Sequence, residues 1–191
     1  MRLFGSAKEQ AKPIETRRLK LDRWTMQDGE ALYRYAQNPN VGPNAGWKPH
    51  ASSRESKRII KQLFLNHLVW KIIWKETGQV IGSIGLDKDR RRPGIASREL
   101  GYSLDENFWG RGIMTEAGQA ILRFAFVELK LDIVSIQTAT DNQRSQRVIK
   151  KLGFTPEGME RQSYRIYDGQ VIDEYVFSML KREYESTYGS R

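Results

Sequence analysis

The sequence predicts an α+β protein, a mixed α/β fold with a mostly antiparallel mixed sheet of about seven strands and flanking helices. Short runs alternate apolar and polar residues, as half-buried strands do, and longer runs repeat apolar residues every three or four positions, as helices do. Thr77-Gly78 and Asp168-Gly169 are turn dipeptides between strand-like runs, so they predict two hairpins. A strand, a helix and a strand within 98–140 predict one crossover unit, which makes the sheet mixed.

Each expected element has a local signal. Leu19 and Leu21 alternate with charged residues in the first strand, and Pro39 ends the helix that follows. Ser52 or Ser53 can cap the second helix, and Gly153 can end the last helix in a left-handed conformation. The expected order is strand 16–25, helices 26–38 and 53–68, strands 69–76, 79–87 and 98–104, helix 113–130, strand 132–140, helix 141–153 and two strands within 154–180.

No linker divides the chain, so we expect a single domain over 13–185, preceded by a flexible polar segment over 1–12. No apolar run is long enough to span a bilayer, and the first residues lack the apolar core of a signal peptide. These features predict a cytoplasmic protein without a membrane partner.

Composition narrows the chemistry. The chain has no cysteine, which excludes disulfides, thiolate metal ligands and cysteine nucleophiles, and no metal site is expected. The formal net charge is +9, so the surface attracts polyanions such as nucleic acid or a phosphate-rich cofactor.

A glycine turn, Gly110-Arg111-Gly112, joins the strand 98–104 to the long helix. A helix N-terminus carries unpaired N–H groups and positive potential, and glycines let phosphate oxygens approach the backbone closely. The pattern G-x-x-x-x-G-K-[ST] is absent, and Thr115 stands where a dinucleotide fingerprint needs its third glycine. A plain strand-to-helix turn and a pyrophosphate site of another kind remain as alternatives.

The stretch ELGYSLDENFWGRGIMTEA, followed by DNQRSQRVIKKLGF, resembles the GCN5-related N-acetyltransferase (GNAT) superfamily. ETRRLKLDRWTMQDGEALYRYAQNPNV and WKPHAS are also similar to the branch that acetylates the N-terminal serine or alanine of ribosomal proteins. The resemblance runs from about Thr16 to Leu180. It implies the GNAT fold, in which two central strands splay apart and the pantetheine arm of acetyl-CoA enters the gap.

The resemblance also implies a cofactor site. In the family, the strand before the glycine turn bonds the pantetheine arm, the turn holds the pyrophosphate, and an N-x-x-S pair, here Asn142 and Ser145, meets the arm and the thioester. Asn107 stands where the family has Gln or Arg, and a simple helix cap is the alternative for Asn142. The expected cofactor-binding residues are Tyr102, Ser103, Leu104, Trp109, Gly110, Arg111, Gly112, Ile113, Met114, Thr115, Asn142 and Ser145.

Acetyl transfer needs a neutral amine, a base, oxyanion stabilisation and, for the leaving thiolate, an acid. Without cysteine, and without a G-x-S-x-G elbow for a serine route, direct attack in a ternary complex remains. Glu99 is the expected base, acting directly or through water, and Ser145 the expected proton donor. Glu76 and Glu174 are weaker candidates for the base, and Tyr164 or Tyr175 could replace Ser145.

The last expectation concerns the amine that accepts the acetyl group. Trp47 and His50 lie in a long loop, which the resemblance places beside the acceptor, and with Tyr164 they are the expected substrate-binding residues. An amine on a protein N-terminus, such as that of a ribosomal protein, is the first expectation. A small amine (a polyamine or an aminoglycoside), a non-catalytic acyl-CoA-binding protein and a nucleic-acid-binding protein remain alternatives, although nucleic acid is not required for the chemistry. Exposed aromatic residues leave a homodimer open.

Overall fold

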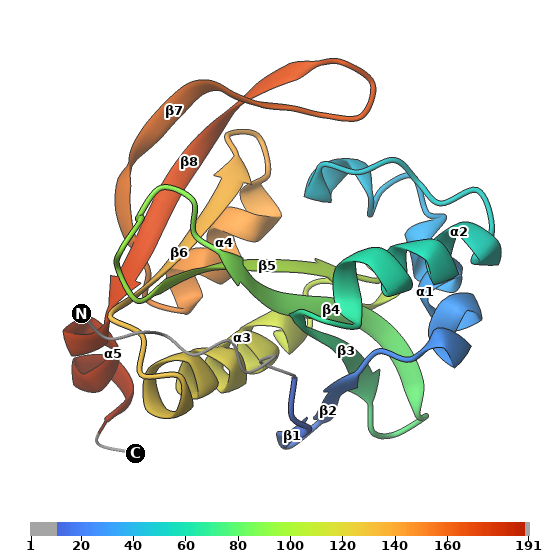
Figure 1. The fold of residues 1–191 in the computed structure, drawn as a ribbon, viewed down its shortest axis with the longest axis horizontal. Coiled ribbons are helices and arrows are strands. Elements are labelled where there is room, and N and C mark those ends of the chain that lie inside the picture. The colour runs from blue at the N-terminus through green and yellow to red at the C-terminus, as the bar shows by residue number, and fades with distance from the viewer. Residues whose placement is uncertain (1–10, 190–191) are drawn as a thin grey trace.

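The computed structural model describes residues 11–189, in which eight strands form one sheet in the order β1-β2-β3-β4-β5-β6-β8-β7. The β5–β6 pair is parallel and every other pair is antiparallel. Figure 1 shows β1 and β2 at one side of the molecule and the β7–β8 hairpin at the other. The strands are β1 Ile14–Glu15, β2 Leu19–Arg23, β3 Leu68–Trp74, β4 Gln79–Lys88, β5 Ser97–Leu104, β6 Ile133–Ala139, β7 Thr155–Arg165 and β8 Val171–Leu180.

Five α-helices accompany the sheet in the described part of the chain. Their bounds are α1 Gly29–Ala36, α2 Ser53–Ile59, α3 Ile113–Arg123, α4 Gln143–Lys151 and α5 Lys181–Tyr188. The chain continues from α2 and α3 into single π-helical turns, Ile60–Phe64 and Phe124–Glu128. Ser52 caps α2 by accepting a hydrogen bond from the Glu55 N–H at 3.2 Å, and Gly153 follows α4 with φ +82°.

The predicted mixed sheet and both hairpins are confirmed. The two-residue β1 and the C-terminal α5 were not predicted. α5 has a mostly polar sequence and is held through its buried residue Tyr184, whose ring stacks on Phe126 at 4.9 Å between centroids. Such a contact is tertiary, so the local pattern does not reveal it.

The expected flexible segment 1–12 lies outside the described residues except for its last two. Ala11 is buried, and the Lys12 carbonyl accepts a hydrogen bond of 2.7 Å from the indole N–H of Trp70. These two residues therefore pack against the sheet, and the structure does not describe residues 1–10.

Two hydrophobic clusters cover opposite faces of the sheet. The larger one joins the sheet to α3, α4 and α5, and the smaller one joins it to α1 and the turn after α2. The neighbouring residues Val80 and Ile81 of β4 belong to different clusters, as expected for successive residues of a strand buried on both faces. Gly118 lets α3 approach α4, because a β-carbon there would lie 2.7 Å from Leu152.

Candidate active site

A cleft opens where β5 and β6 separate. The strands pair only through Ser97–Glu99 and Ile133–Ser135, and beyond Glu99 the described residues place no strand on this side of β5. The cleft has a volume of about 530 Å³ and is lined by β5, β6, the start of α3, α4 and the loop 43–46. The unpaired edge of β5 gives it backbone hydrogen-bonding groups, as the predicted splay requires.

The glycine turn forms one end of this cleft. Gly110 and Gly112 line it and have φ of +75° and +70°, a conformation that disfavours side chains. A β-carbon on Gly110 would meet nothing within 4 Å, and one on Gly112 only the Arg18 guanidinium at 3.8 Å. The space above both glycines is therefore open to a ligand.

The first turn of α3 offers its backbone to the cleft. Gly112 is the N-cap and supplies no side-chain cap, and the first helical hydrogen bond runs from the Glu116 N–H to the Gly112 carbonyl. Ile113 and Met114 bury their side chains in the core, so they face the cleft through the main chain. The N–H groups of Ile113 to Thr115 are left for an anion.

Three basic residues of α4 line the same cleft, and they were not predicted to be site residues. Arg144, Arg147 and Lys151 are three and four positions apart, so they lie on one face of the helix. The Arg144 guanidinium lies 4.6 Å from the ring centroid of Trp109. The i, i+3, i+7 spacing was available in the sequence, but the position of α4 beside the glycine turn was not.

Ser145 meets Tyr102 across the cleft, and Asn142 holds the start of the Ser145 helix. Asn142 caps α4 by accepting a hydrogen bond of 3.0 Å from the Ser145 N–H, and it donates one of 3.1 Å to the Asn44 carbonyl. The Ser145 hydroxyl lies 2.9 Å from the Tyr102 hydroxyl. Burial raises the pKa of Tyr102 to about 12, so this hydroxyl keeps its proton at neutral pH. Tyr102 was expected to act through its backbone only.

Glu99 lines the cleft at the point where β5 and β6 separate. Burial raises the pKa of this carboxyl above its ordinary value, and the nearby Arg91 guanidinium opposes that shift. Because a strand rises about 3.3 Å per residue, Glu99 lies roughly 16 Å along β5 from Leu104, where the strand ends before the glycine turn. The cleft therefore has a basic, glycine-rich end and an end with a carboxyl of raised pKa.

Other lining residues come from β6, β7 and β8. Glu174 of β8 lies close enough to raise the pKa of Glu99, and Gln137 of β6 lines the same cleft. Tyr164 of β7 is 46% exposed and reaches the loop 43–46, because a β-carbon on Gly46 would lie 2.8 Å from its ring. Glu76 and Tyr175, both alternative candidates, do not line the cleft.

The structure does not bring Trp47 and His50 to the cleft lining, contrary to expectation. His50 is buried, its Nδ1 lies 2.8 Å from the Ser56 hydroxyl, and burial lowers the pKa of its imidazole. Trp47 packs against it with ring centroids 5.1 Å apart and the two ring planes tilted by 49°. Both rings hold the loop in place, and the loop reaches the cleft through Pro43–Gly46 instead.

The remaining predicted cofactor-binding residues are Ser103, Leu104 and Arg111. Ser103 lines the cleft, with its hydroxyl 3.0 Å from that of Ser83. The Leu104 carbonyl accepts a hydrogen bond of 2.9 Å from the Trp109 indole, which fixes the turn. Arg111 is not among the lining residues, and its guanidinium lies over the ring of Phe108 at 5.2 Å.

Residues 11–189 contain no helix that is both long and apolar enough to cross a membrane. The same part of the chain has no group of three or more His, Cys, Asp or Glu side chains placed to hold a metal ion.

The sequence of residues 18–155 matches the family model described as "Acetyltransferase (GNAT) domain". The chain belongs to the GNAT acetyltransferase family. It is 33% identical over 176 residues to the uncharacterized N-acetyltransferase p20 of Bacillus licheniformis, covering 90% of this chain and 97% of the relative. A ribosomal-protein-serine acetyltransferase of Escherichia coli is 33% identical over 97 residues, 51% of this chain and 52% of the relative.

The GNAT fold is also found in a solved acetyltransferase structure from Bacillus anthracis. That structure superposes with a TM-score of 0.81 at 22% identity and covers 90% of this chain and 100% of its own. The protein is thus an acetyl-CoA-dependent N-acetyltransferase. Its residues fit this cofactor, because the open glycine turn and the three cleft-lining basic side chains suit a pyrophosphate.

Proposed function

We propose that this N-acetyltransferase acetylates the α-amine of a protein N-terminus by direct attack in a ternary complex. Glu99 takes the proton of the amine, and Ser145 donates a hydrogen bond or proton to the leaving thiolate. The observation that carries the proposal is that Glu99 and the Ser145–Tyr102 pair line one cleft, whose other end suits a pyrophosphate.

The raised pKa of Glu99 suits a base. A carboxyl with an ordinary pKa is a weak proton acceptor at neutral pH, and burial brings Glu99 closer to the working pH. The carboxyl is also placed to attract a protonated amine before it is deprotonated, with Glu174 beside it. The amine then attacks the thioester carbonyl, the new C–N bond forms, and the C–S bond breaks as the tetrahedral intermediate collapses.

The Ser145 hydroxyl and the Tyr102 hydroxyl form the candidate acid. A serine alone has too high a pKa to donate a proton readily. A hydrogen bond from the protonated Tyr102 makes the Ser145 proton more acidic, because it stabilises the negative charge that develops on the serine oxygen. The pair can thus pass a proton toward sulfur, or hold the thiolate by a hydrogen bond.

Two features support a protein N-terminus as acceptor. The cleft is also lined by the exposed side chain of Tyr164 and by Pro43–Gly46, segments on which a peptide can lie. The similarity over half the chain to a ribosomal-protein-serine acetyltransferase supports the same acceptor class. Small amines lack the peptide groups that would use these segments.

The test is an acceptor screen that follows thiol release from acetyl-CoA. Hexapeptides that begin with Ser or Ala are compared with their N-terminally blocked forms, a polyamine and an aminoglycoside. We expect the free peptides to have the highest kcat/KM, by at least about tenfold, and the blocked peptides to be inert. A preference for the polyamine or the aminoglycoside would contradict this acceptor.

A further inference from the structure

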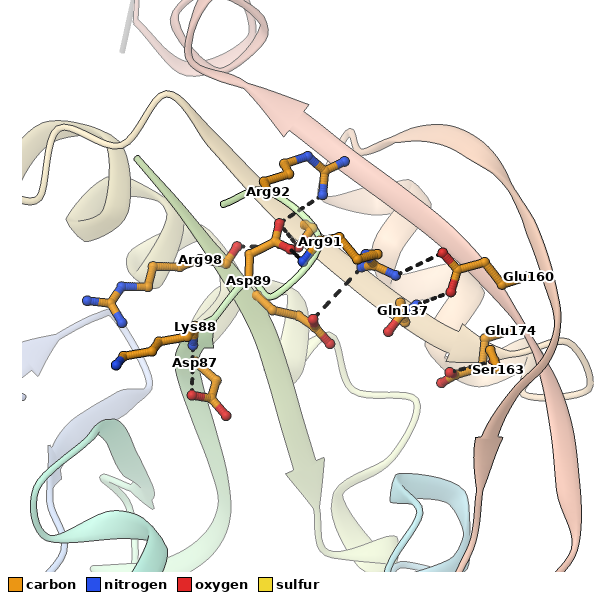
Figure 2. A network of polar contacts seen from close by, with 12 residues as sticks. Asp87, Lys88, Asp89, Arg91, Arg92, Arg98, Gln137, Glu160, Ser163 and Glu174 are labelled. Atoms are coloured by element: carbon orange, nitrogen blue, oxygen red, sulfur yellow. Dashed lines mark hydrogen bonds and ion pairs between the residues drawn. The ribbon is translucent and has the colours of Figure 1, made fainter. Parts of the chain in front are cut away.

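Arg91, in the loop between β4 and β5, lies between two carboxylates. Its guanidinium is 3.8 Å from an oxygen of Glu99 and 3.5 Å from an oxygen of Glu160 on β7. Figure 2 shows the side chain reaching from this loop toward β7. Its three nitrogens are buried, and within residues 11–189 none of them makes a hydrogen bond. A buried guanidinium without hydrogen bonds is costly, so its position calls for a reason.

Anchoring the loop is not that reason, because other residues do it. Arg92 binds Asp89 at 2.8 Å, and it also binds Glu157 of β7. Asp89 in turn accepts a hydrogen bond of 2.9 Å from the buried Ser135 of β6. These contacts tie the loop to β6 and β7 without Arg91.

We propose that Arg91 is a positioning residue that divides its positive charge between Glu99 and Glu160, so that Glu160 sets how firmly Glu99 is held in its ionised form. The functional part of this proposal rests on the proposed role of Glu99 as the base. Glu160 is itself held by a hydrogen bond of 3.0 Å from the Gln137 amide, so its distance from Arg91 is fixed by β6.

The charges around Glu99 agree with this arrangement. Burial raises the pKa of Glu99, and so do the negative charges of Asp89 in the loop, Glu174 of β8 and Asp87 of β4. Arg91 acts in the opposite direction. Arg91 thus favours the ionised form of Glu99, whereas burial and the three carboxylates disfavour it. Glu160 lies beside the same guanidinium and competes with Glu99 for its charge.

The first experiment measures the ionisation of Glu99 directly, by a ¹³C NMR titration of the side-chain carboxyls, with Glu99→Gln to assign the signal. Arg91→Met should move the titration midpoint of Glu99 upward, because the cation that favours the ionised form is lost. Glu160→Gln should move it downward, because the full charge of Arg91 then acts on Glu99. In the Arg91→Met background, Glu160→Gln should have a much smaller effect than it has alone.

A matched control separates this effect from a general change of charge. Arg90→Met removes the same charge from the exposed neighbouring residue. It should not move the midpoint appreciably. Arg91→Lys provides a second, charge-retaining variant if Arg91→Met does not fold. With Lys, the midpoint should stay nearer the wild-type value.

The second readout is kcat/KM for a hexapeptide with a free N-terminal alanine, compared at low pH and on its plateau. The ratio of kcat/KM at low pH to kcat/KM on the plateau should fall about threefold in Arg91→Met, because a higher midpoint leaves less Glu99 ionised at low pH. The same ratio should rise in Glu160→Gln, because the midpoint is lower there. Equal effects of Glu160→Gln with and without Arg91, or midpoints that do not move, would overturn the charge sharing. If the midpoints move as expected but Glu99→Gln keeps full activity, the base and the role of Arg91 in catalysis are overturned together.

Discussion

At the scale of single residues, the site combines groups that the sequence identified with a partner that it did not. Glu99 and Ser145 line the cleft as expected, but the hydroxyl of Tyr102 beside Ser145 came only from the structure. The spacing of residues 102 and 145 carries no signal for this contact, because it joins a strand to a helix 43 positions away.

The Ser145–Tyr102 pair gives the first prediction. Ser145→Ala should lower kcat about tenfold while leaving the affinity for acetyl-CoA almost unchanged, because the hydroxyl matters most when the thiolate leaves. Tyr102→Phe should lower kcat less, and the double variant should be no worse than Ser145→Ala. Steady-state kinetics and calorimetry measure both quantities. Additive losses would show that the two hydroxyls act independently.

The raised pKa of Tyr102 has a consequence for pH. A group with its pKa raised to about 12 stays protonated throughout the usual assay range. We therefore expect no loss of kcat from this tyrosine between pH 7 and pH 9 and the same alkaline profile for wild type and Tyr102→Phe. An alkaline decline that vanishes in Tyr102→Phe would contradict this assignment.

The glycine turn permits a closely matched comparison. Gly110 and Gly78 both have positive φ and open space around the missing β-carbon, but Gly78 lies in the β3–β4 turn, outside the cleft. Gly110→Ala and Gly78→Ala should each destabilise the fold by about 1–2 kcal/mol. Only Gly110→Ala should raise the KM for acetyl-CoA severalfold. Equal KM values in the two variants, at equal melting temperatures, would remove the turn from the cofactor site.

At the scale of elements, the end of the cleft that we propose for the cofactor lies where α3 and α4 meet. The start of α3 supplies unpaired N–H groups, and one face of α4 supplies Arg144, Arg147 and Lys151. Lys151 lines the cleft, whereas its neighbour Lys150 does not. Apolar periodicity predicted α3, and the Gly153 cap marked the end of α4, but only packing at Gly118 and Leu152 shows which faces meet.

The basic face of α4 gives a prediction with a neighbouring control. Arg147→Gln should raise the KM for acetyl-CoA by about three- to tenfold, because one charge facing the phosphates is lost. Lys150→Gln removes the same charge from an exposed position of α4 outside the cleft and should change KM little. The ratio of the two KM values, measured at low salt, tests whether position or total charge matters.

At the scale of the whole molecule, net charge says little about the site. The chain carries +9, yet the end of the cleft proposed for the amine contains Glu99 and Glu174. The order of strands and helices along the chain could be predicted from alternation and turn dipeptides, which are local signals, and the splay from the family resemblance. The positions of the Trp47 and His50 side chains could not be predicted, because the sequence of a loop does not show which of its residues turn inward.

The cleft lining brings together three segments that are distant in sequence, the loop 43–46, the β7–β8 hairpin and β5. Under the proposed function Tyr164 contacts the peptide acceptor, so Tyr164→Ala should raise the KM for a peptide acceptor about fivefold and leave that for acetyl-CoA unchanged. Tyr167→Ala alters an exposed aromatic residue of the same hairpin and should change neither value. A rise in the KM for acetyl-CoA alone would place Tyr164 at the wrong end of the cleft.

The most direct test of the proposed mechanism is the activity of Glu99→Gln, measured together with its affinity for acetyl-CoA. The amide keeps the size of the side chain but cannot accept the proton of the amine. The mechanism predicts a fall in kcat of about 10²–10⁴-fold with a Kd for acetyl-CoA within twofold of wild type. Wild-type activity in Glu99→Gln at every pH would contradict it.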